Sequence, residues 1–418
     1  MYTNLNFENL SEVHSEKVGI EIRTDMDLSV NDNVLIDKAG FDKTIPKESW
    51  CVVGSSYQQA YSTHGLFRYF GKFPPSIATF LITQYTKELD LVIDPMSGSG
   101  TTAVECLHLN RKCIANDVNP LSQKIIKVKT TNISKRKLNK VLSWIEENYK
   151  PLTIDEYNFI PADCNYEHWF LEETCNSLRG IKFLIEQIED IDIRDFYEVI
   201  FASIIRRVSK ATTQQGRLFL DVETAEEDAF SFFKKKAIKE IENVAKLPKG
   251  KRKVTVINSD VRGDEIKKYR NKAALVILHP PYFNSYKYSS INSLESGWLD
   301  LQRSEVRPHE IREFFKVGKA EKYIDYVSDM VDALNQSLSL LKKGGMLALM
   351  IGDTVIKGSY IQVTQSIINS IDTTKYSVEK IVLRVPKYTE ASWVTSQRRD
   401  TNNVGVTLND FIILIRKR

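Results

Sequence analysis

The sequence contains no run of about 18 apolar residues, so it predicts no membrane-spanning helix. Its N-terminal stretch, MYTNLNFENLSEVHSEK, is polar and acidic and lacks the basic start and apolar core of a signal peptide. Five cysteines, at positions 51, 106, 113, 164 and 175, include no CxxC pair, and the six histidines are dispersed. We therefore expect no disulfide framework, no metal site, no membrane contact and a reducing, cytoplasmic location.

Net charge is also small. The formal charge is +4 and the sequence pI is about 8.5, which permits nucleic-acid binding without demanding it. Hydrophobic residues make up 42% of the 418 residues and charged residues 27%, enough apolar material for a sizeable core. At about 100–200 residues per domain, the length predicts two or three structural units.

The front half of a doubly wound α/β sheet is visible between residues 64 and 120. Pro74 and Pro75 suit a helix start. The apolar run LDLVIDP is typical of a buried parallel strand, and a glycine-rich turn, the helical TTAVECLHLN and the strand RKCIANDVNP follow it. This order predicts a Rossmann-like sheet.

The pattern then becomes mainly helical from about 130 to 250, with examples in KRKLNKVLSWIEENYKPL and RDFYEVIFASIIRRVSKA. Strands return with VTVINSD and ALVILHPPY, and MLALMIGD, YSVEKIVLRV and LNDFIILIRK end the sheet. A helix over 322–343 should be closed by Gly344 and Gly345. We divide the chain into an N-terminal arm or cap (1–50), a first sheet part (51–130), a helical insertion (131–250) and a second sheet part (251–418).

The first motif with chemical content is the turn DPMSGSGTT. A strand delivers Asp94 to the carboxyl edge of the sheet, where ligands of such folds bind. Gly98 and Gly100 allow a tight turn and a close approach to a ligand, and Thr101 and Thr102 can cap the next helix. A plain strand-to-helix turn would use the same residues. A P-loop is excluded because Gly-Lys-Ser/Thr is missing, and the dinucleotide spacing GxGxxG is met only in a looser form.

Two further carboxylates follow predicted strands. Asp117 comes about 20 positions after the glycine turn, where an acidic residue accepts hydrogen bonds from ribose hydroxyls. Asp260 follows the strand VTVINSD and would face the adenine amino group of a cofactor. Both would equally serve as ordinary turn carboxylates.

The stretch ALVILHPPYFNSY is the most telling. Pro280 and Pro281 cannot continue a strand and fix the backbone carbonyls in set directions. Acceptors on both N–H bonds of an exocyclic amine would localise its lone pair for attack on a sulfonium methyl group. Tyr282 offers a flat face for a base flipped out of a duplex. A strand-ending turn with a core tyrosine is the alternative for these residues.

Together these motifs resemble the DNA amino-methyltransferases, the adenine-N6 and cytosine-N4 enzymes of restriction–modification systems. Their DPFxGSGTT is DPMSGSGTT here, and their Asp, Asn or Ser before Pro-Pro-Tyr is His279. Their Lys-Phe-x-Pro is matched by KFPP at 72–75, and HPPYFNSYKYSSINSLESGWL resembles a subset with a Leu-Glu-x-x-x-Leu helix. The likeness covers about 64–125, 250–360 and the closing strands.

The resemblance implies S-adenosylmethionine as cofactor and double-stranded DNA as substrate, and it allows for a cognate restriction endonuclease as partner. It implies that base activation falls to the tetrapeptide His279, Pro280, Pro281 and Tyr282. It implies a cofactor site made from Lys72, Phe73, Pro74, Asp94, Pro95, Met96, Gly98, Ser99, Gly100, Thr101, Asp117 and Asp260.

His279 departs from the family pattern. Neutral imidazole accepts a hydrogen bond through one nitrogen, and imidazolium accepts none. We therefore expect activity to fall as pH drops through about 6–7, near the ordinary histidine pKa. Serine often marks cytosine enzymes, and aspartate or asparagine marks adenine enzymes. Histidine marks neither, and we favour cytosine-N4. Met96, in place of the usual phenylalanine, should only reshape cofactor packing.

DNA recognition is expected in the helical insertion, which carries basic residues that suit phosphate contacts. A solvated surface would show similar charges. The candidates in the insertion are Arg206, Arg207, Lys210, Arg217, Lys234, Lys235, Lys236, Lys246, Lys249, Lys251, Arg252 and Lys253. A second candidate is 387–399, with Trp393, Gln397 and Arg398. An RNA amino-methyltransferase and a non-catalytic subunit of the same fold are the alternatives.

Overall fold

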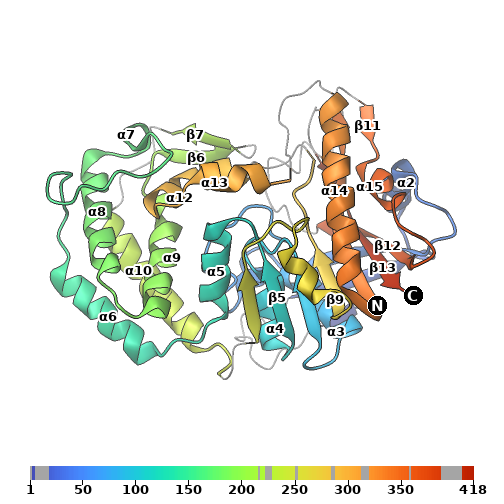
Figure 1. Cartoon of the computed structure of the whole chain (residues 1–418), viewed down its shortest axis with the longest axis horizontal. Coiled ribbons are helices and arrows are strands. Elements are labelled where there is room, and N and C mark those ends of the chain that lie inside the picture. The colour runs from blue at the N-terminus through green and yellow to red at the C-terminus, as the bar shows by residue number, and fades with distance from the viewer. Residues whose placement is uncertain are drawn as a thin grey trace.

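One mixed sheet carries both predicted motifs (Figure 1). The computed structural model describes residues 2–4, 18–214, 217–221, 228–249, 253–283, 288–311, 320–356, 359–386 and 407–418. Across the sheet the strands are β1 (Tyr2–Asn4), β2 (Gly19–Thr24), β3 (Lys47–Val53), β12 (Tyr376–Pro386), β13 (Thr407–Lys417), β10 (Leu341–Ile356), β9 (Ala273–Leu278), β4 (Leu91–Asp94), β5 (Lys112–Asn116) and β8 (Val254–Ile257), with β11 (Ser359–Ile361) paired to β10.

The five strands from β8 to β10 are parallel, and β13 runs antiparallel between β10 and β12. All six residues of β9 are buried because helices cover both faces of the sheet, which explains its uninterrupted apolar sequence. Ile93 and Val276 face one side, and Val92 and Leu275 face the other. The expected doubly wound α/β class, including the closing strand pair, is confirmed.

Helices from both halves of the sheet domain cover these two faces. One face packs against α2 (Val30–Ala39), α14 (Ala320–Leu340) and α15 (Val363–Ile368). The other packs against α3 (Pro75–Tyr85) and α4 (Thr101–His108). Pro75 is the first residue of α3, as predicted, because its fixed φ suits a helix start and its missing N–H is not needed there.

Two parts of the chain fold differently from their sequence patterns. In segment 1–50, β2 and β3 extend the sheet beyond β12, and α2 between them begins with a capping box at Ser29. The helix expected over 322–343 ends at Leu340, so the glycine pair does not close it. Gly344, at φ +73°, lies instead in β10 at an irregularity of its pairing with β9.

The segment after α5 (Pro120–Thr130) forms a helical lobe beside the sheet, at the left of Figure 1. Its core joins apolar faces such as Leu138, Leu142 and Ile145, spaced at helical intervals. The lobe consists of α6 (Lys135–Asn148), α7 (Tyr166–Trp169), α8 (Glu172–Glu186), α9 (Ile191–Ile205), α10 (Ala229–Ala245) and an unpredicted hairpin, β6 (Ala211–Gln214) with β7 (Arg217–Leu220).

The chain returns to the lobe after the tetrapeptide His279-Pro280-Pro281-Tyr282. There α11 (Tyr288–Ile291) is followed by α12 (Ser293–Trp298), whose Trp298 is fully buried in the lobe core. A Cβ on Gly297 would lie 2.4 Å from the Ala162 carbonyl oxygen, so only glycine fits this contact. The segment that follows the tetrapeptide is therefore anchored on the insertion as well as on the sheet.

Candidate active site

A pocket with about 890 Å³ of empty space, part of it open to solvent, lies at the carboxyl ends of β4, β5, β8 and β9. Most of the residues predicted from the motifs line it: Lys72, Phe73, Pro95, Met96, Gly98, Ser99, Thr101, Asp117, Asp260, His279 and Pro281. The other five predicted residues, Pro74, Asp94, Gly100, Pro280 and Tyr282, adjoin lining residues in the chain. The structure thus brings the two motifs to one cavity.

The glycine turn has the geometry that its sequence predicts. Gly98 and Gly100 have φ values of +49° and +76°, in the left-handed region that glycine adopts without strain. A Cβ on Gly100 would lie 2.8 Å from Cγ1 of Ile126. The predicted threonine cap is wrong, because Gly100 itself is the N-cap of α4 and no side chain caps this helix end.

Asp94, the last residue of β4, is almost fully buried below the turn. One carboxylate oxygen accepts a hydrogen bond from the Met96 backbone N–H at 3.2 Å. Burial raises the pKa of Asp94 to about 7, and the neighbouring Asp117 carboxylate adds to this rise. The role of Asp94 is therefore to shape the turn from beneath rather than to line the pocket.

Asp117 joins the turn to the next strand. Its Oδ2 accepts a hydrogen bond from the Gly98 backbone N–H at 2.7 Å, and its Oδ1 accepts one from Asn119 N–H at 2.9 Å. Burial raises the pKa of Asp117 to about 6, against the opposing effect of these hydrogen bonds. The Ser122 side chain also hydrogen-bonds to this carboxylate, so one of its four lone pairs stays available for a ribose hydroxyl.

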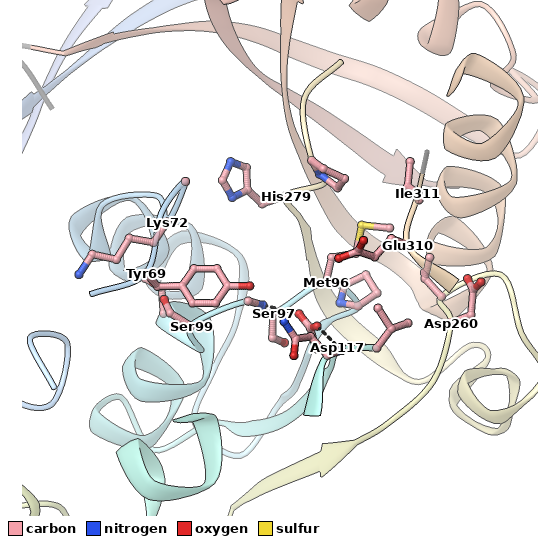
Figure 2. A pocket seen from close by; sticks show the side chains of 18 of the residues that line it. Tyr69, Lys72, Met96, Ser97, Ser99, Asp117, Asp260, His279, Glu310 and Ile311 are labelled. Atoms are coloured by element: carbon pink, nitrogen blue, oxygen red, sulfur yellow. Dashed lines mark hydrogen bonds between the residues drawn. The ribbon is translucent and has the colours of Figure 1, made fainter. Parts of the chain in front are cut away.

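Tyr69 is a lining residue that the motifs did not identify. Its ring extends across the pocket toward Asp117 in Figure 2, and its hydroxyl is 3.1 Å from Oγ of Ser122 on α5. A Cβ on Gly98 would lie 3.1 Å from the Tyr69 ring, so ring and turn are in close contact. The aromatic run HGLFRYFGKF was the available signal, but it did not distinguish Tyr69 from its neighbours.

Lys129 was also missed. It is fully buried on α5, and its ammonium donates to the Ser99 carbonyl oxygen at 2.7 Å, which fixes the turn from behind. Burial lowers the pKa of Lys129 well below its ordinary value. The sequence carries no signal for this role, because the contact joins residues 30 positions apart.

Lys72 and Phe73 contribute to the pocket in different ways. The Lys72 ammonium points away from the cavity in Figure 2 and donates to the His64 carbonyl oxygen at 3.1 Å. Burial lowers the pKa of Lys72. Phe73 is buried, and its ring meets the His279 ring edge-on, with centroids 5.3 Å apart. Phe73 is therefore the link between the cofactor segment and the catalytic tetrapeptide.

In the tetrapeptide, Nε2 of His279 lies 3.3 Å from the Tyr282 hydroxyl oxygen. Tyr326, buried on α14, donates its hydroxyl to the Pro281 carbonyl oxygen at 2.8 Å and fixes the backbone there. Burial lowers the pKa of His279 to about 4, and the positive charge of Arg384 lowers it further. The imidazole is therefore neutral at pH 7, and the expected loss of activity through pH 6–7 cannot come from His279.

Asp260 lines the pocket beyond the end of β8 and is bound by Arg262. Burial by itself would raise the pKa of Asp260, but the hydrogen bonds and charge of Arg262 outweigh it and hold this pKa below its ordinary value. Asp260 is thus an ionised pocket carboxylate whose negative charge is balanced by the guanidinium of Arg262.

Several basic residues of the insertion have internal partners. Arg206 pairs with Glu295 of α12 at 2.8 Å, which ties the lobe to the catalytic segment. Lys234 pairs with Glu146 at 3.0 Å, and Lys236 pairs with Glu240 at 2.9 Å. The charges of these three side chains are therefore already balanced within the protein, which makes them weaker candidates for phosphate contacts.

Lys253, the last residue of the basic run before β8, lies at the edge of the sheet opposite the pocket. Its carbonyl oxygen accepts a backbone hydrogen bond from Cys113 at the amino ends of β8 and β5, whereas the pocket lies at their carboxyl ends. This position argues against Lys253 as part of a DNA surface over the pocket. Lys251, Arg252 and the C-terminal candidate region 387–399 lie outside the described residues.

Within the described ranges, no three or more His, Cys, Asp and Glu side chains are grouped so that they could hold a metal ion. Over the same residues, no helix is long and apolar enough to cross a membrane. All five cysteines are free thiols.

Known proteins resemble parts of the sequence. Residues 16–128 match the N6/N4 methyltransferase family model, described as DNA methylase. The type II methyltransferase M.MvaI of Kocuria varians is 28% identical over 306 residues, which cover 66% of this chain and 66% of that protein. The type II methyltransferase M.MjaII of Methanocaldococcus jannaschii is 33% identical over 88 residues, 21% of this chain and 17% of that protein.

Among solved structures, TrmN from Thermus thermophilus is 9% identical with a TM-score of 0.31, covering 84% of this chain and 50% of that one. The family match spans the Lys-Phe-Pro-Pro segment and the glycine turn, and M.MvaI aligns over most of the chain. Over these regions the chain is similar to DNA amino-methyltransferases, and it spans about 66% of M.MvaI and 17% of M.MjaII.

Proposed function

We propose that this protein transfers the methyl group of S-adenosylmethionine to the exocyclic amino nitrogen of a base in DNA. The observation that carries the proposal is the convergence of the glycine turn and His279-Pro-Pro-Tyr on one pocket. M.MvaI and M.MjaII are named type II methyltransferases, which supports both the reaction and a site-specific DNA substrate.

The residues present fit the family's cofactor. When bound, S-adenosylmethionine supplies a methyl carbon made electrophilic by its sulfonium. The Ser99 hydroxyl, buried in the turn with no hydrogen-bond partner among the described residues, is free to contact the amino-acid end of the cofactor. Asp117 would accept a hydrogen bond from the ribose, and Asp260 and Val261 lie where the adenine would bind. Tyr69 would cover this ligand from the side opposite Asp260.

His279 and the Pro280 carbonyl would activate the target amine. Because desolvation lowers the pKa of His279 to about 4, the imidazole is uncharged at pH 7 and keeps an acceptor nitrogen. Two acceptors on the amine localise its lone pair for attack on the methyl carbon. The Tyr282 ring would hold the flipped base by stacking during the transfer. S-adenosylhomocysteine would be the leaving group, and the methylated nitrogen would release one proton to water.

We favour cytosine-N4 as the target. A neutral imidazole presents one acceptor and no charge, as a serine hydroxyl would, whereas an aspartate adds a negative charge. His279 thus lacks the charge of the aspartate in adenine enzymes, a property it shares with serine and also with asparagine.

We place the DNA duplex over the carboxyl edge of the sheet, beside Arg68. This exposed side chain precedes the lining residue Tyr69, and its guanidinium lies 5.1 Å from the Phe70 ring centroid. Arg206 approaches the same ring at 5.7 Å, but Glu295 neutralises its charge. No carboxylate pairs with Arg68 in the described part of the chain, so its charge suits a phosphate. We further propose a cytoplasmic enzyme that acts with a cognate restriction endonuclease.

Methyl transfer to DNA and to RNA, assayed side by side with radiolabelled S-adenosylmethionine, tests this function. Mass spectrometry of the digested product would identify N4-methylcytosine or N6-methyladenine. We expect N4-methylcytosine in DNA, and no transfer by His279→Leu. Methylation of RNA alone, or equal rates for the parent and His279→Leu, would contradict the proposal.

A further inference from the structure

Arg262, just beyond the end of β8, contacts three separate parts of the chain. Its Nε and Nη2 donate to the two carboxylate oxygens of Asp260 at 2.9 and 2.6 Å. Its Nη1 pairs with Asp329 of α14 at 2.8 Å, and Nη2 also donates to the His309 carbonyl oxygen at 3.3 Å. The Asp329 side chain is only 8% exposed, so the guanidinium is held on a rigid helix.

The bidentate contact fixes the carboxylate plane of Asp260. A guanidinium fork matches both oxygens at once, which a single point charge cannot do. The Arg262 backbone N–H adds a third hydrogen bond to Oδ1 at 2.9 Å. Asp260 therefore lines the pocket as an ionised acceptor with one orientation. Oδ1 accepts two of these hydrogen bonds, so the remaining lone pair lies on Oδ2.

The contact with His309 fixes the wall next to Asp260. The following residues, Glu310 and Ile311, line the same pocket. Figure 2 shows Asp260, Glu310 and Ile311 together on the side of the pocket opposite Tyr69. The Arg262 side chain thus binds both the Asp260 carboxylate and the segment 309–311, which forms the wall at this end of the pocket.

We propose that Arg262 is the positioning residue that makes this pocket selective for adenine as the base of its cofactor. The inference rests on the proposed cofactor function. Arg262 holds Asp260 so that the carboxylate accepts an N–H from the 6-amino group, and it holds residues 309–311 against the base. A base with an oxygen at position 6, such as hypoxanthine, would place an acceptor against the fixed carboxylate, which has no proton to offer.

Calorimetry with two ligands tests this role: S-adenosylhomocysteine and its deaminated counterpart, in which hypoxanthine replaces adenine. The parent should bind the adenine ligand at least about tenfold more tightly, since a hydrogen bond to a charged group is worth about that much. Arg262→Gln should bring the affinity ratio close to one. Arg262→Lys should retain only part of it, because an ammonium cannot hold both oxygens and reach His309.

Asp329→Asn is the matched control. It removes one ion pair of Arg262 and leaves the fork on Asp260 in place, so the ratio should stay within about twofold of the parent. Asp260→Asn should bring the ratio of adenine-ligand to hypoxanthine-ligand affinity close to one, as Arg262→Gln does. The double variant Asp260→Asn with Arg262→Gln should lower this ratio no further than either single change.

The outcomes separate the inference from the proposed function. If the parent binds neither ligand, the cofactor assignment itself is wrong. If the parent discriminates and both Arg262 variants keep its ratio, or if Asp329→Asn loses the ratio equally, Arg262 is a structural tie and not a positioning residue. A parent ratio near one would overturn the inference while leaving cofactor binding intact.

Discussion

The pocket and the helical lobe use charged residues in opposite ways. In the pocket, Asp94 and Asp117 are buried against backbone N–H groups, and burial raises their pKa values to about 7 and 6. In the lobe, Lys234 and Lys236 are paired with carboxylates. Ionisable groups whose pKa values are strongly shifted by their surroundings are typical of ligand sites. Ion pairs between charged side chains are typical of parts of a protein without a catalytic role. From this contrast we expect the chemistry at the sheet edge.

A buried ion pair links the lobe to the segment that follows the tetrapeptide. Arg206 at the end of α9 binds Glu295, which belongs to the Leu-Glu-x-x-x-Leu segment after the catalytic tetrapeptide. Both side chains are largely buried, with exposed fractions of 12% and 6%. Loss of either partner would leave an unpaired charge in the interior, which is strongly destabilising. The ion pair therefore stabilises the contact between the lobe and the segment that follows the tetrapeptide.

The largest effect is expected at the glycine turn. Gly100→Val should abolish S-adenosylmethionine binding in calorimetry, because its φ is +76° and its Cβ would lie 2.8 Å from Ile126. Gly344→Ala is the matched control, since Gly344 has φ +73° but nothing within 4 Å of a Cβ. It should lose about 1 kcal/mol of stability and keep the affinity. Parent-like affinity of a folded Gly100→Val would separate the turn from cofactor binding.

The next effect is on turnover. Tyr282→Ala should lower the rate of methyl transfer by roughly 5- to 150-fold, the equivalent of about 1–3 kcal/mol of base stacking. Tyr282→Phe should keep most of the rate if only the ring matters, although the hydroxyl lies 3.3 Å from His279. His279→Leu should lose most activity and His279→Asn should keep it, because asparagine retains an acceptor. Cofactor affinity should be unchanged in all four variants.

Whether the sequence could predict a site residue depends on what determines its position. Residues at strand ends are placed by the order of strands, whereas other residues are placed by contacts with residues distant in sequence. The turn, Asp117, Asp260 and the tetrapeptide follow strand ends, so their place at one sheet edge followed from the order of strands. Tyr69 and Arg262 act through Ser122, Asp329 and His309, which are far away in sequence.

The position of Lys253, by contrast, followed from sequence order alone. A residue directly before a strand lies at the amino end of that strand, as Lys253 does at β8, whereas ligands of such sheets bind at the carboxyl ends. The pKa of His279 was misjudged because burial by Phe73 and its neighbours is a tertiary effect.

A smaller effect concerns pH and distinguishes the carboxylates from the histidine. A carboxylate with a raised pKa loses its charge as pH falls through that value. The dissociation constant of S-adenosylmethionine should therefore rise as pH drops below about 6, by up to tenfold per pH unit for the one proton on Asp117. Asp117→Asn should bind weakly, with a flatter pH profile. At saturating cofactor, turnover should stay level until pH approaches about 4, where His279 protonates. A fall in saturated turnover through pH 6–7 that disappears in His279→Asn would contradict this order.

The smallest effect tests which edge of the molecule binds DNA. Arg68→Ala should weaken DNA binding a few-fold and lower the slope of log affinity against log salt by about one, because one phosphate contact is lost. The double change Lys249→Ala and Lys253→Ala removes two charges of the basic run that ends at the opposite edge of the sheet with Lys253, and it should leave the slope unchanged. Cofactor affinity should stay at the parent value in both variants, so any change reports on DNA alone. A lower slope for the lysine variant with none for Arg68→Ala would move the DNA surface to the amino ends of the strands, where no predicted motif lies. That result would break the assignment of DNA and cofactor to one edge, because a base flipped from such a duplex could not reach His279.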